Sequence, residues 1–188
     1  MKKLVIAIVL ACFALSGAAQ EHLSFKGIPI EGSMVSFCQK LKDKGFTQTD
    51  REKNITFFKG DFTGRDATVA VGATDNGQDV FSVCVFFDET DSWNSLVDTY
   101  VHYKDLYTEK YGKPTLCVEN NPCSIDSNTI KMNALDQGRV TYASVFEARG
   151  GEILISIEKG SLFKGFVVIK YEDSLNVKAK RQSDLDEI

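Results

Sequence analysis

The chain has 188 residues, of which 43% are hydrophobic and 26% are charged, and its formal net charge is −4 at pH 7. A mildly acidic chain with both signs interspersed does not favour nucleic acid or an anionic membrane surface as a partner. Only two residues are histidine, so mechanisms that need a histidine base have few candidates. The composition therefore indicates a soluble globular protein with a sizeable core.

The N-terminus carries the pattern of a secretory signal peptide. Lys2 and Lys3 precede an apolar stretch over residues 4–15, and small residues follow at positions 16–19. A basic start, a short apolar stretch and small residues before the cleavage point are typical of such peptides. We expect residues 1–19 to be removed and the chain to be exported, to the periplasm or outside the cell. Later apolar runs are far shorter than the roughly 20 residues of a membrane span.

An alternative processing site lies at Cys12. Residues 9–12 (Val-Leu-Ala-Cys) resemble a lipobox, in which Cys12 would become the lipidated first residue. The apolar run before Cys12 is very short and continues beyond it, whereas a polar linker usually follows a lipidated cysteine. Cleavage after Ala19 is therefore the favoured interpretation.

Residues 20–88 predict one helix and a series of strands. Residues 23–30 alternate apolar and polar side chains, as a half-buried strand does, and Pro29 confines that strand to an edge or an end. Ser33 is a suitable N-cap for a helix that Gly45 would end. Further strands are expected over residues 46–49, 55–62, 67–71 and 80–87.

Residues 89–172 repeat this order of elements. Thr90 or Asp91 can cap a longer helix that runs to about Tyr111, with Gly112 as its terminator. Four strands are expected near residues 115–118, 140–146, 153–157 and 163–171.

Two stretches lie outside these regular elements. Residues 119–137 form a long, polar, turn-rich interruption, and residues 173–188 form a polar C-terminal tail that is expected to be solvated. The predicted fold class is α+β, with antiparallel strands and with helices packed on one face of the sheet. Two interpretations stay open: a helix-plus-antiparallel-strands unit repeated in tandem, or one continuous domain without internal symmetry.

Four cysteines follow the predicted signal peptide. Cys117 and Cys123 bracket a short stretch that a disulfide could close, with a stabilisation of about 2 kcal/mol on chain-entropy grounds. Cys38 lies on the apolar face of the first helix, and Cys84 lies in an apolar strand. Two interpretations of this pair stay equally open: a disulfide between them, or two buried free thiols. No histidine lies near the closer pair to complete a tetrahedral zinc site, so neither a metal nor a cofactor is expected.

The sequence offers no catalytic constellation. His22 is expected in a flexible N-terminal stretch and His102 on the surface of the long helix, and no Gly-X-Ser-X-Gly motif accompanies them. The acidic cluster over residues 88–91 is better explained by capping of the long helix than by acid–base catalysis. Tyr103 could be exposed beside the sheet, whereas the other tyrosines of that helix are expected to face the core.

Several segments resemble small exported proteins of Gram-negative gut commensals. The resemblance rests on the signal peptide, on residues 23–32 (Leu-Ser-Phe-Lys-Gly-Ile-Pro-Ile-Glu-Gly), on the helix end at residues 44–46, and on residues 109–114 (Glu-Lys-Tyr-Gly-Lys-Pro). It implies export and the length of a single module, and it carries no activity.

The order of elements is also similar to the β-lactamase-inhibitor-protein-like arrangement. In that family, tandem helix-plus-four-strand units form a concave sheet that binds proteins. This chain has one predicted helix per unit where that family has two. The similarity implies a protein-binding sheet.

These observations lead to the expectation of an exported, non-enzymatic binding module for a protein or a cell-envelope component. The alternative is a carboxylate-based secreted hydrolase acting on glycans, which needs two carboxylates facing each other about 5–10 Å apart. A third possibility is an envelope scaffold without a ligand. An uncovered sheet face with aromatic residues would favour binding, and a deep pocket with paired carboxylates would favour hydrolysis.

Overall fold

The computed structural model describes residues 21–75, 77–123, 125–186 and 188. The predicted signal peptide and the alternative site at Cys12 lie outside the described residues. Within the described ranges, no helix combines the length and the apolar character that crossing a membrane requires.

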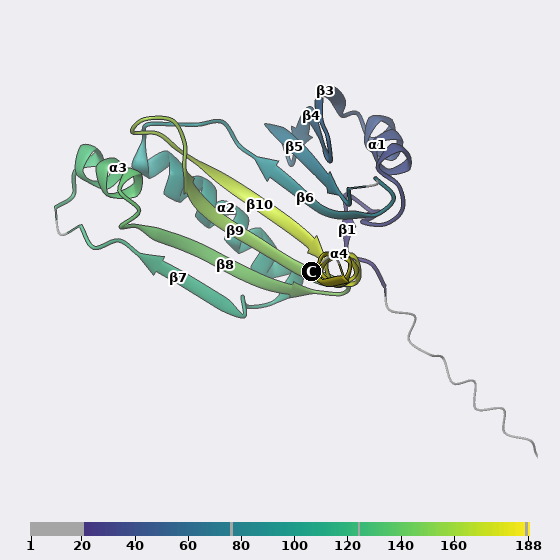
Figure 1. Ribbon diagram of the computed structural model, residues 1–188. Helices are drawn as coiled ribbons and strands as arrows, with labels where there is room; N and C mark the ends of the chain where they lie inside the picture. Colours follow the sequence, from purple (N-terminus) through teal and green to yellow (C-terminus); the bar gives the residue numbers. More distant parts are fainter. Residues whose placement is uncertain (1–20, 76, 124, 187) are drawn as a thin grey trace, which may run out of the picture.

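The centre of the fold is an eight-stranded antiparallel sheet with the order β3-β4-β5-β6-β10-β9-β8-β7, beside which β1 and β2 form a small hairpin (Figure 1). The strands are β1 (Ser24–Phe25), β2 (Ile28–Pro29), β3 (Thr47–Glu52), β4 (Ile55–Phe62), β5 (Arg65–Ala73), β6 (Val80–Phe86), β7 (Leu116–Asn120), β8 (Thr141–Ala148), β9 (Gly151–Lys159) and β10 (Gly165–Asp173). The helices are α1 (Met34–Asp43), α2 (Trp93–Tyr111), α3 (Asn128–Asp136) and α4 (Ser174–Asp186). The α+β fold class is confirmed.

The sheet consists of two four-stranded meanders. Strands β3 to β6 follow α1 in the chain, and strands β7 to β10 follow α2. The last strand of each meander pairs with the other, with Val168 opposite Phe86 and Lys170 opposite Cys84. The two meanders therefore share one continuous hydrogen-bonded sheet.

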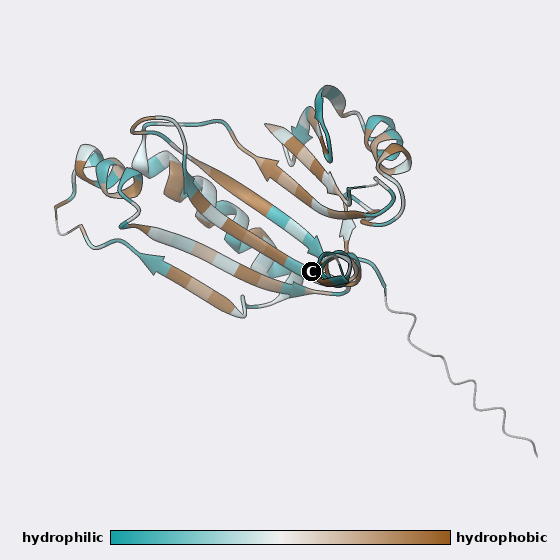
Figure 2. Cartoon of the chain, in the orientation of Figure 1, coloured by the Kyte–Doolittle hydropathy of each residue, from teal (hydrophilic) through white to brown (hydrophobic). Residues whose placement is uncertain are grey.

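One face of the sheet carries the hydrophobic core. On β10, Val167, Ile169 and Tyr171 are buried in the core, while Phe166 and Lys170 alternate with them and are half-buried. This alternation follows from the two-residue period of a strand. Helix α2 packs on β8, β9 and β10, α1 packs on β5, and α3 packs on β9 and β10 (Figure 2).

Serine caps define where α1 and α2 begin. The hydroxyl of Ser33 accepts a hydrogen bond from Ser36 N, as predicted, and the hydroxyl of Ser92 accepts one from Ser95 N. The predicted caps Thr90 and Asp91 are therefore wrong by one or two residues. The Thr90 hydroxyl instead accepts a hydrogen bond from Ser92 N, which leaves the capping position to the next hydroxyl in the chain.

The segment predicted as a single strand over residues 23–30 is a hairpin. Lys26 and Gly27 adopt φ values of 49° and 78° and reverse the chain between β1 and β2. Glycine adopts positive φ without strain, so Gly27 allows a turn here. The alternation of apolar and polar residues does not reveal this turn. Leu23, Phe25, Ile28 and Ile30 are still buried, as the alternation predicts.

Both segments expected to be irregular contain a helix. Helix α3 lies in the stretch over residues 119–137 and buries Met132, Ala134 and Leu135 against the core. Helix α4 replaces the expected irregular tail, although none of its described side chains is fully buried. The contacts that hold α4 come from distant parts of the chain, so local patterning does not indicate them.

Candidate functional site

The sheet has a second face that α1, α2 and α3 leave uncovered, and we call it the open face. Strand register brings seven side chains on it into one row. In order across the sheet they are Phe57, Ala70, Cys84, Lys170, Leu154, Val145 and Leu116. A single cation, Lys170, interrupts this otherwise apolar row.

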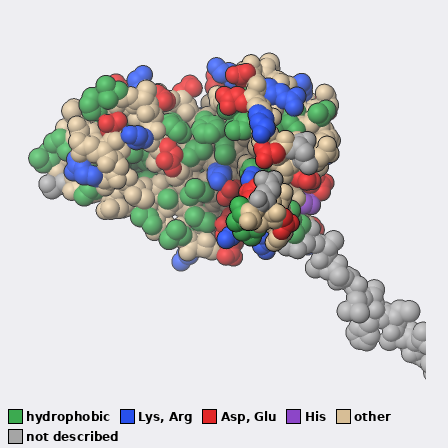
Figure 3. Space-filling view, in the orientation of Figure 1, with side chains coloured by type: hydrophobic (Ala, Val, Ile, Leu, Met, Phe, Trp, Pro, Cys, Tyr) green, Lys and Arg blue, Asp and Glu red, His purple; other side chains and the backbone are tan. Residues whose placement is uncertain are grey.

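A parallel row lies one pleat away on the same face. Its members in order are Lys59, Thr68, Phe86, Val168, Ser156, Ala143 and Val118. The rings of Phe86 and Phe166 lie 6.0 Å apart between centroids and flank Val168, which is only 8% exposed. Figure 3 shows the resulting apolar surface in the hollow centre of the molecule.

Charged groups line one side of this surface. Glu147, Glu152 and Glu172 occupy directly opposed positions on β8, β9 and β10. Lys170 Nζ lies 2.7 Å from Glu172 Oε1, so one of the three carboxylates is paired within the sheet. The open face therefore has an apolar centre with an acidic border.

The four cysteines of the described chain are free thiols. The predicted Cys117–Cys123 bridge is not present. Residues 116–120 form the extended strand β7 instead of a loop, and extension separates the two cysteines. The Cys117 thiol lies 3.5 Å from the Ser144 hydroxyl, and the Cys123 thiol lies 3.9 Å from Ile130 O in the α3 region.

Cys38 and Cys84 are not bridged because they lie on opposite sides of the sheet. Cys38 is buried on α1 beside Thr56, whereas Cys84 lies on the open face between Ala70 and Lys170. Burial raises the pKa of the Cys84 thiol to about 11, and it also raises the pKa of the Cys38 thiol. Both therefore stay protonated at neutral pH.

The two histidines lie apart. His102 is exposed on α2 next to the ring of Tyr103. Tyr103 itself is fully buried, which corrects the expectation that it could be exposed. Its hydroxyl donates to Phe62 O at 3.3 Å and lies 3.0 Å from the Thr63 hydroxyl, so a core position satisfies its polar end.

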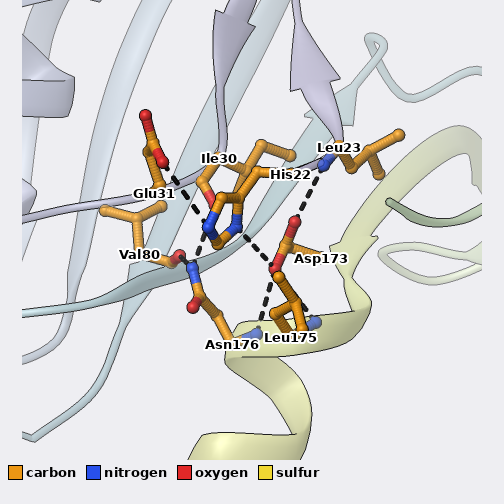
Figure 4. A network of polar contacts seen from close by, with 8 residues as sticks. All are labelled: His22, Leu23, Ile30, Glu31, Val80, Asp173, Leu175 and Asn176. Carbon is orange, nitrogen blue, oxygen red and sulfur yellow. Dashed lines mark hydrogen bonds and ion pairs between the residues drawn. The ribbon is translucent and has the colours of Figure 1, made fainter. Parts of the chain in front are cut away.

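His22 belongs to a polar network that joins the start of the described chain to the beginning of α4 (Figure 4). Its Nδ1 lies 3.1 Å from Asp173 Oδ1, and its Nε2 lies 3.5 Å from Glu31 Oε2. Asp173 is fully buried and accepts hydrogen bonds from the backbone N–H groups of Leu23, Leu175 and Asn176. His22 is therefore packed in place, and its expected flexibility is not seen.

The acidic cluster at residues 88–91 has a structural partner. Both carboxylate oxygens of Glu89 accept hydrogen bonds from Ser161, one from its backbone N–H and one from its hydroxyl. These bonds hold the pKa of Glu89 below its ordinary value. Across the described residues, no group of three histidine, cysteine, aspartate or glutamate side chains is arranged to hold a metal ion.

Comparisons of the chain with protein-family models, with curated proteins and with solved structures find no match. The candidate site is therefore assigned from the geometry alone. The sequence singled out cysteines, histidines and acidic clusters, and the structure does not gather them into one place. The residues of the open face were not identified from the sequence, because the row depends on strand register and on the β6–β10 pairing between the two halves of the chain.

Proposed function

We propose that the protein is an exported, non-enzymatic binding module that takes a protein partner on the open face. The observation that supports this proposal is an eight-stranded sheet with a face that α1, α2 and α3 leave uncovered and on which one row of seven side chains is apolar apart from Lys170. Contiguous apolar surface of this kind on a folded chain is typical of interaction sites. Export rests on the N-terminal sequence pattern.

The chemistry of the open face defines the complementary partner. Phe86, Phe166 and Leu154 on β6, β10 and β9 offer aromatic and aliphatic surface at the centre of the sheet, where interfaces concentrate their binding free energy. Glu147 and Glu152 lie on the border and would attract basic side chains. We therefore expect a partner that presents an apolar strip with lysine or arginine residues along one side.

The glycan hydrolase alternative depends on paired carboxylates across a cleft. Glu147, Glu152 and Glu172 are neighbours in one row of a sheet, so their side chains project in the same direction. A glycosidic bond needs an acid on one side and a carboxylate on the other. This arrangement favours binding over hydrolysis.

Site-specific photocrosslinking tests the proposal. A benzophenone amino acid at Phe166 places the probe on the open face, and the same probe at Val35 places it on an exposed position of α1. We expect a discrete crosslinked protein from position 166 in the native cell and none from position 35. Crosslinks of equal yield from both positions would contradict the proposal.

A charge-insertion pair provides the quantitative control. Leu154→Glu puts a carboxylate at the centre of the open face and should weaken binding of the crosslinked partner by about tenfold or more. Val35→Glu adds the same charge at a side chain that is 70% exposed and should leave binding unchanged. Thermal unfolding of both variants shows whether the fold is intact.

A further inference from the structure

A cavity of about 570 Å³ opens on the side of the molecule where α2 ends, away from the open face. The β1–β2 hairpin, the second half of α2, the β8–β9 turn and β10 enclose it. Its volume lies in the range of sites for small organic molecules. We call it the aromatic pocket.

Four aromatic residues form the floor of the aromatic pocket. Phe62, Tyr103, Tyr107 and Tyr171 line it, and each of these side chains is at most 8% exposed. The hydroxyls of Tyr107 and Tyr171 bond to each other, and the Tyr103 hydroxyl bonds to Phe62 O. Because these hydroxyls are already satisfied within the protein, the floor offers a ligand apolar surface.

The rim of the aromatic pocket is basic although the whole chain is acidic. Lys26, Lys110 and Arg149 line the pocket, against a single carboxylate, that of Glu21. Glu21 pairs with Arg149 at 3.0 Å. Among the described residues, neither Lys26 nor Lys110 forms an ion pair. The Lys26 ammonium donates a hydrogen bond to Asp61 O at 3.1 Å and lies over the rings of Phe46 and Phe62, and the Lys110 ammonium lies over the ring of Tyr111.

We propose that the aromatic pocket binds a small amphiphilic anion, with its apolar body on the tyrosine floor and its carboxylate between Lys26 and Lys110. Apolar burial supplies the driving force and the cations select the anionic head. Oxygen anions near two ammonium groups form charge-assisted hydrogen bonds, which are stronger than neutral ones. The closest chemical class is a long-chain carboxylate, such as a free fatty acid.

Isothermal titration with oleate and with oleyl alcohol tests this proposal, because the two share a chain and differ in head-group charge. We expect oleate to bind with one-to-one stoichiometry and at least tenfold more tightly than the alcohol. Binding to vesicles that contain an anionic phospholipid is measured separately, since a phospholipid carries acyl chains and a negative charge as oleate does. Equal affinity for acid and alcohol would overturn the proposal, and binding to vesicles alone would overturn its assignment to a free carboxylate.

Matched variants locate the bound molecule. Leu106 lines the pocket and is 40% exposed, so Leu106→Glu adds a negative charge there without opening the core; Leu162→Glu adds it at a 74% exposed position outside the pocket. Leu106→Glu should weaken oleate binding by at least tenfold, and Leu162→Glu should not change it. The double variant Lys26→Gln/Lys110→Gln should remove the preference for the acid, whereas Lys113→Gln should keep it.

The two proposals fail separately. If Leu154→Glu abolishes oleate binding and Leu106→Glu does not, the ligand occupies the open face and the pocket assignment is wrong. Loss of the protein partner with oleate binding intact would leave the pocket assignment standing.

Discussion

At the scale of single residues, Asp173 connects parts of the chain that are far apart in sequence. Its carboxylate accepts the Leu23 N–H at 2.8 Å and caps the start of α4 through the N–H groups of Leu175 and Asn176. Asn176 in turn donates to Ile30 O and Val80 O. One buried acid thus fixes both the N-terminal segment and the last helix.

Removal of this acid should destabilise the fold strongly. Asp173→Ala leaves three backbone donors without their acceptor, so we expect the free energy of unfolding to fall by about 3 kcal/mol or more. Asp173→Asn keeps one acceptor oxygen and should cost less. Urea unfolding measures both, and Asp126→Asn at an exposed ion pair should change little. A small effect of Asp173→Ala would show that water replaces the carboxylate.

The rate of thiol alkylation should distinguish Cys84 on the open face from Cys117 on β7. The pKa of Cys84 is raised to about 11 by burial, and Cys117 is exposed on β7. Because the thiolate is the reactive form, iodoacetamide at about pH 8 should modify Cys117 well before Cys84. Peptide mapping by mass spectrometry measures the order. Comparable rates at both positions would contradict the burial of Cys84.

At the scale of elements, the turn between β8 and β9 determines the path of the N-terminal segment. Gly150 has φ of +90°, and a Cβ placed there would lie 2.3 Å from Glu21 O and 2.4 Å from Leu23 N. The backbone of residues 21–23 therefore passes directly over this turn. No other residue type fits without displacing that segment.

Substitutions at Gly150 and Gly138 separate the cost of backbone strain from the cost of a steric clash. Gly138 also has positive φ, +68°, but a Cβ there would meet nothing within 4 Å. Gly138→Ala should cost about 1 kcal/mol from backbone strain alone, and Gly150→Ala should cost clearly more because it adds a clash with backbone. Thermal and urea unfolding measure the difference. Equal losses would mean that the N-terminal segment moves aside freely.

At the scale of the whole molecule, the β6–β10 pairing joins the two meanders. Five opposed residue pairs connect these strands, and α4 contacts β6, β9 and β10. A shared sheet and a shared core couple the unfolding of the two parts. We therefore regard the described chain as one cooperative unit.

Cooperative unfolding can be checked with probes from the two meanders. Trp93 is the single tryptophan and lies on α2, whereas Cys38 is buried on α1. Urea midpoints from Trp93 fluorescence and from Cys38 labelling should coincide. Cys38→Ala serves as the control for background labelling. Separate midpoints would show that each helix and its strands fold independently.

High pH should destabilise the whole fold. Burial raises the pKa values of Tyr107, Tyr171 and Cys84 in the folded state. Above about pH 9 the unfolded chain loses protons that the folded chain keeps, so the free energy of unfolding falls as pH rises. The urea midpoint should be constant up to about pH 9 and should then fall progressively up to about pH 11, less steeply in Tyr171→Phe. A constant midpoint would show that these groups ionise within the fold.

The sequence by itself determined the elements whose patterns are local. The serine cap and apolar face of α1, the long stripe of α2 and the alternation of the strands are all properties of neighbouring residues, and the α+β class follows from them. Export remains a prediction from the same kind of local pattern.

Only the tertiary structure decided which segments meet. Cys117 and Cys123 are close in sequence but are separated by an extended strand, and the buried Tyr103 has its hydroxyl satisfied by Phe62 O and the Thr63 hydroxyl. The open face exists because β6 pairs with β10, and the aromatic pocket exists because the β1–β2 hairpin and the β8–β9 turn meet at the end of α2. Such contacts depend on packing between distant parts of the chain, and the spacing of neighbouring residues does not indicate them.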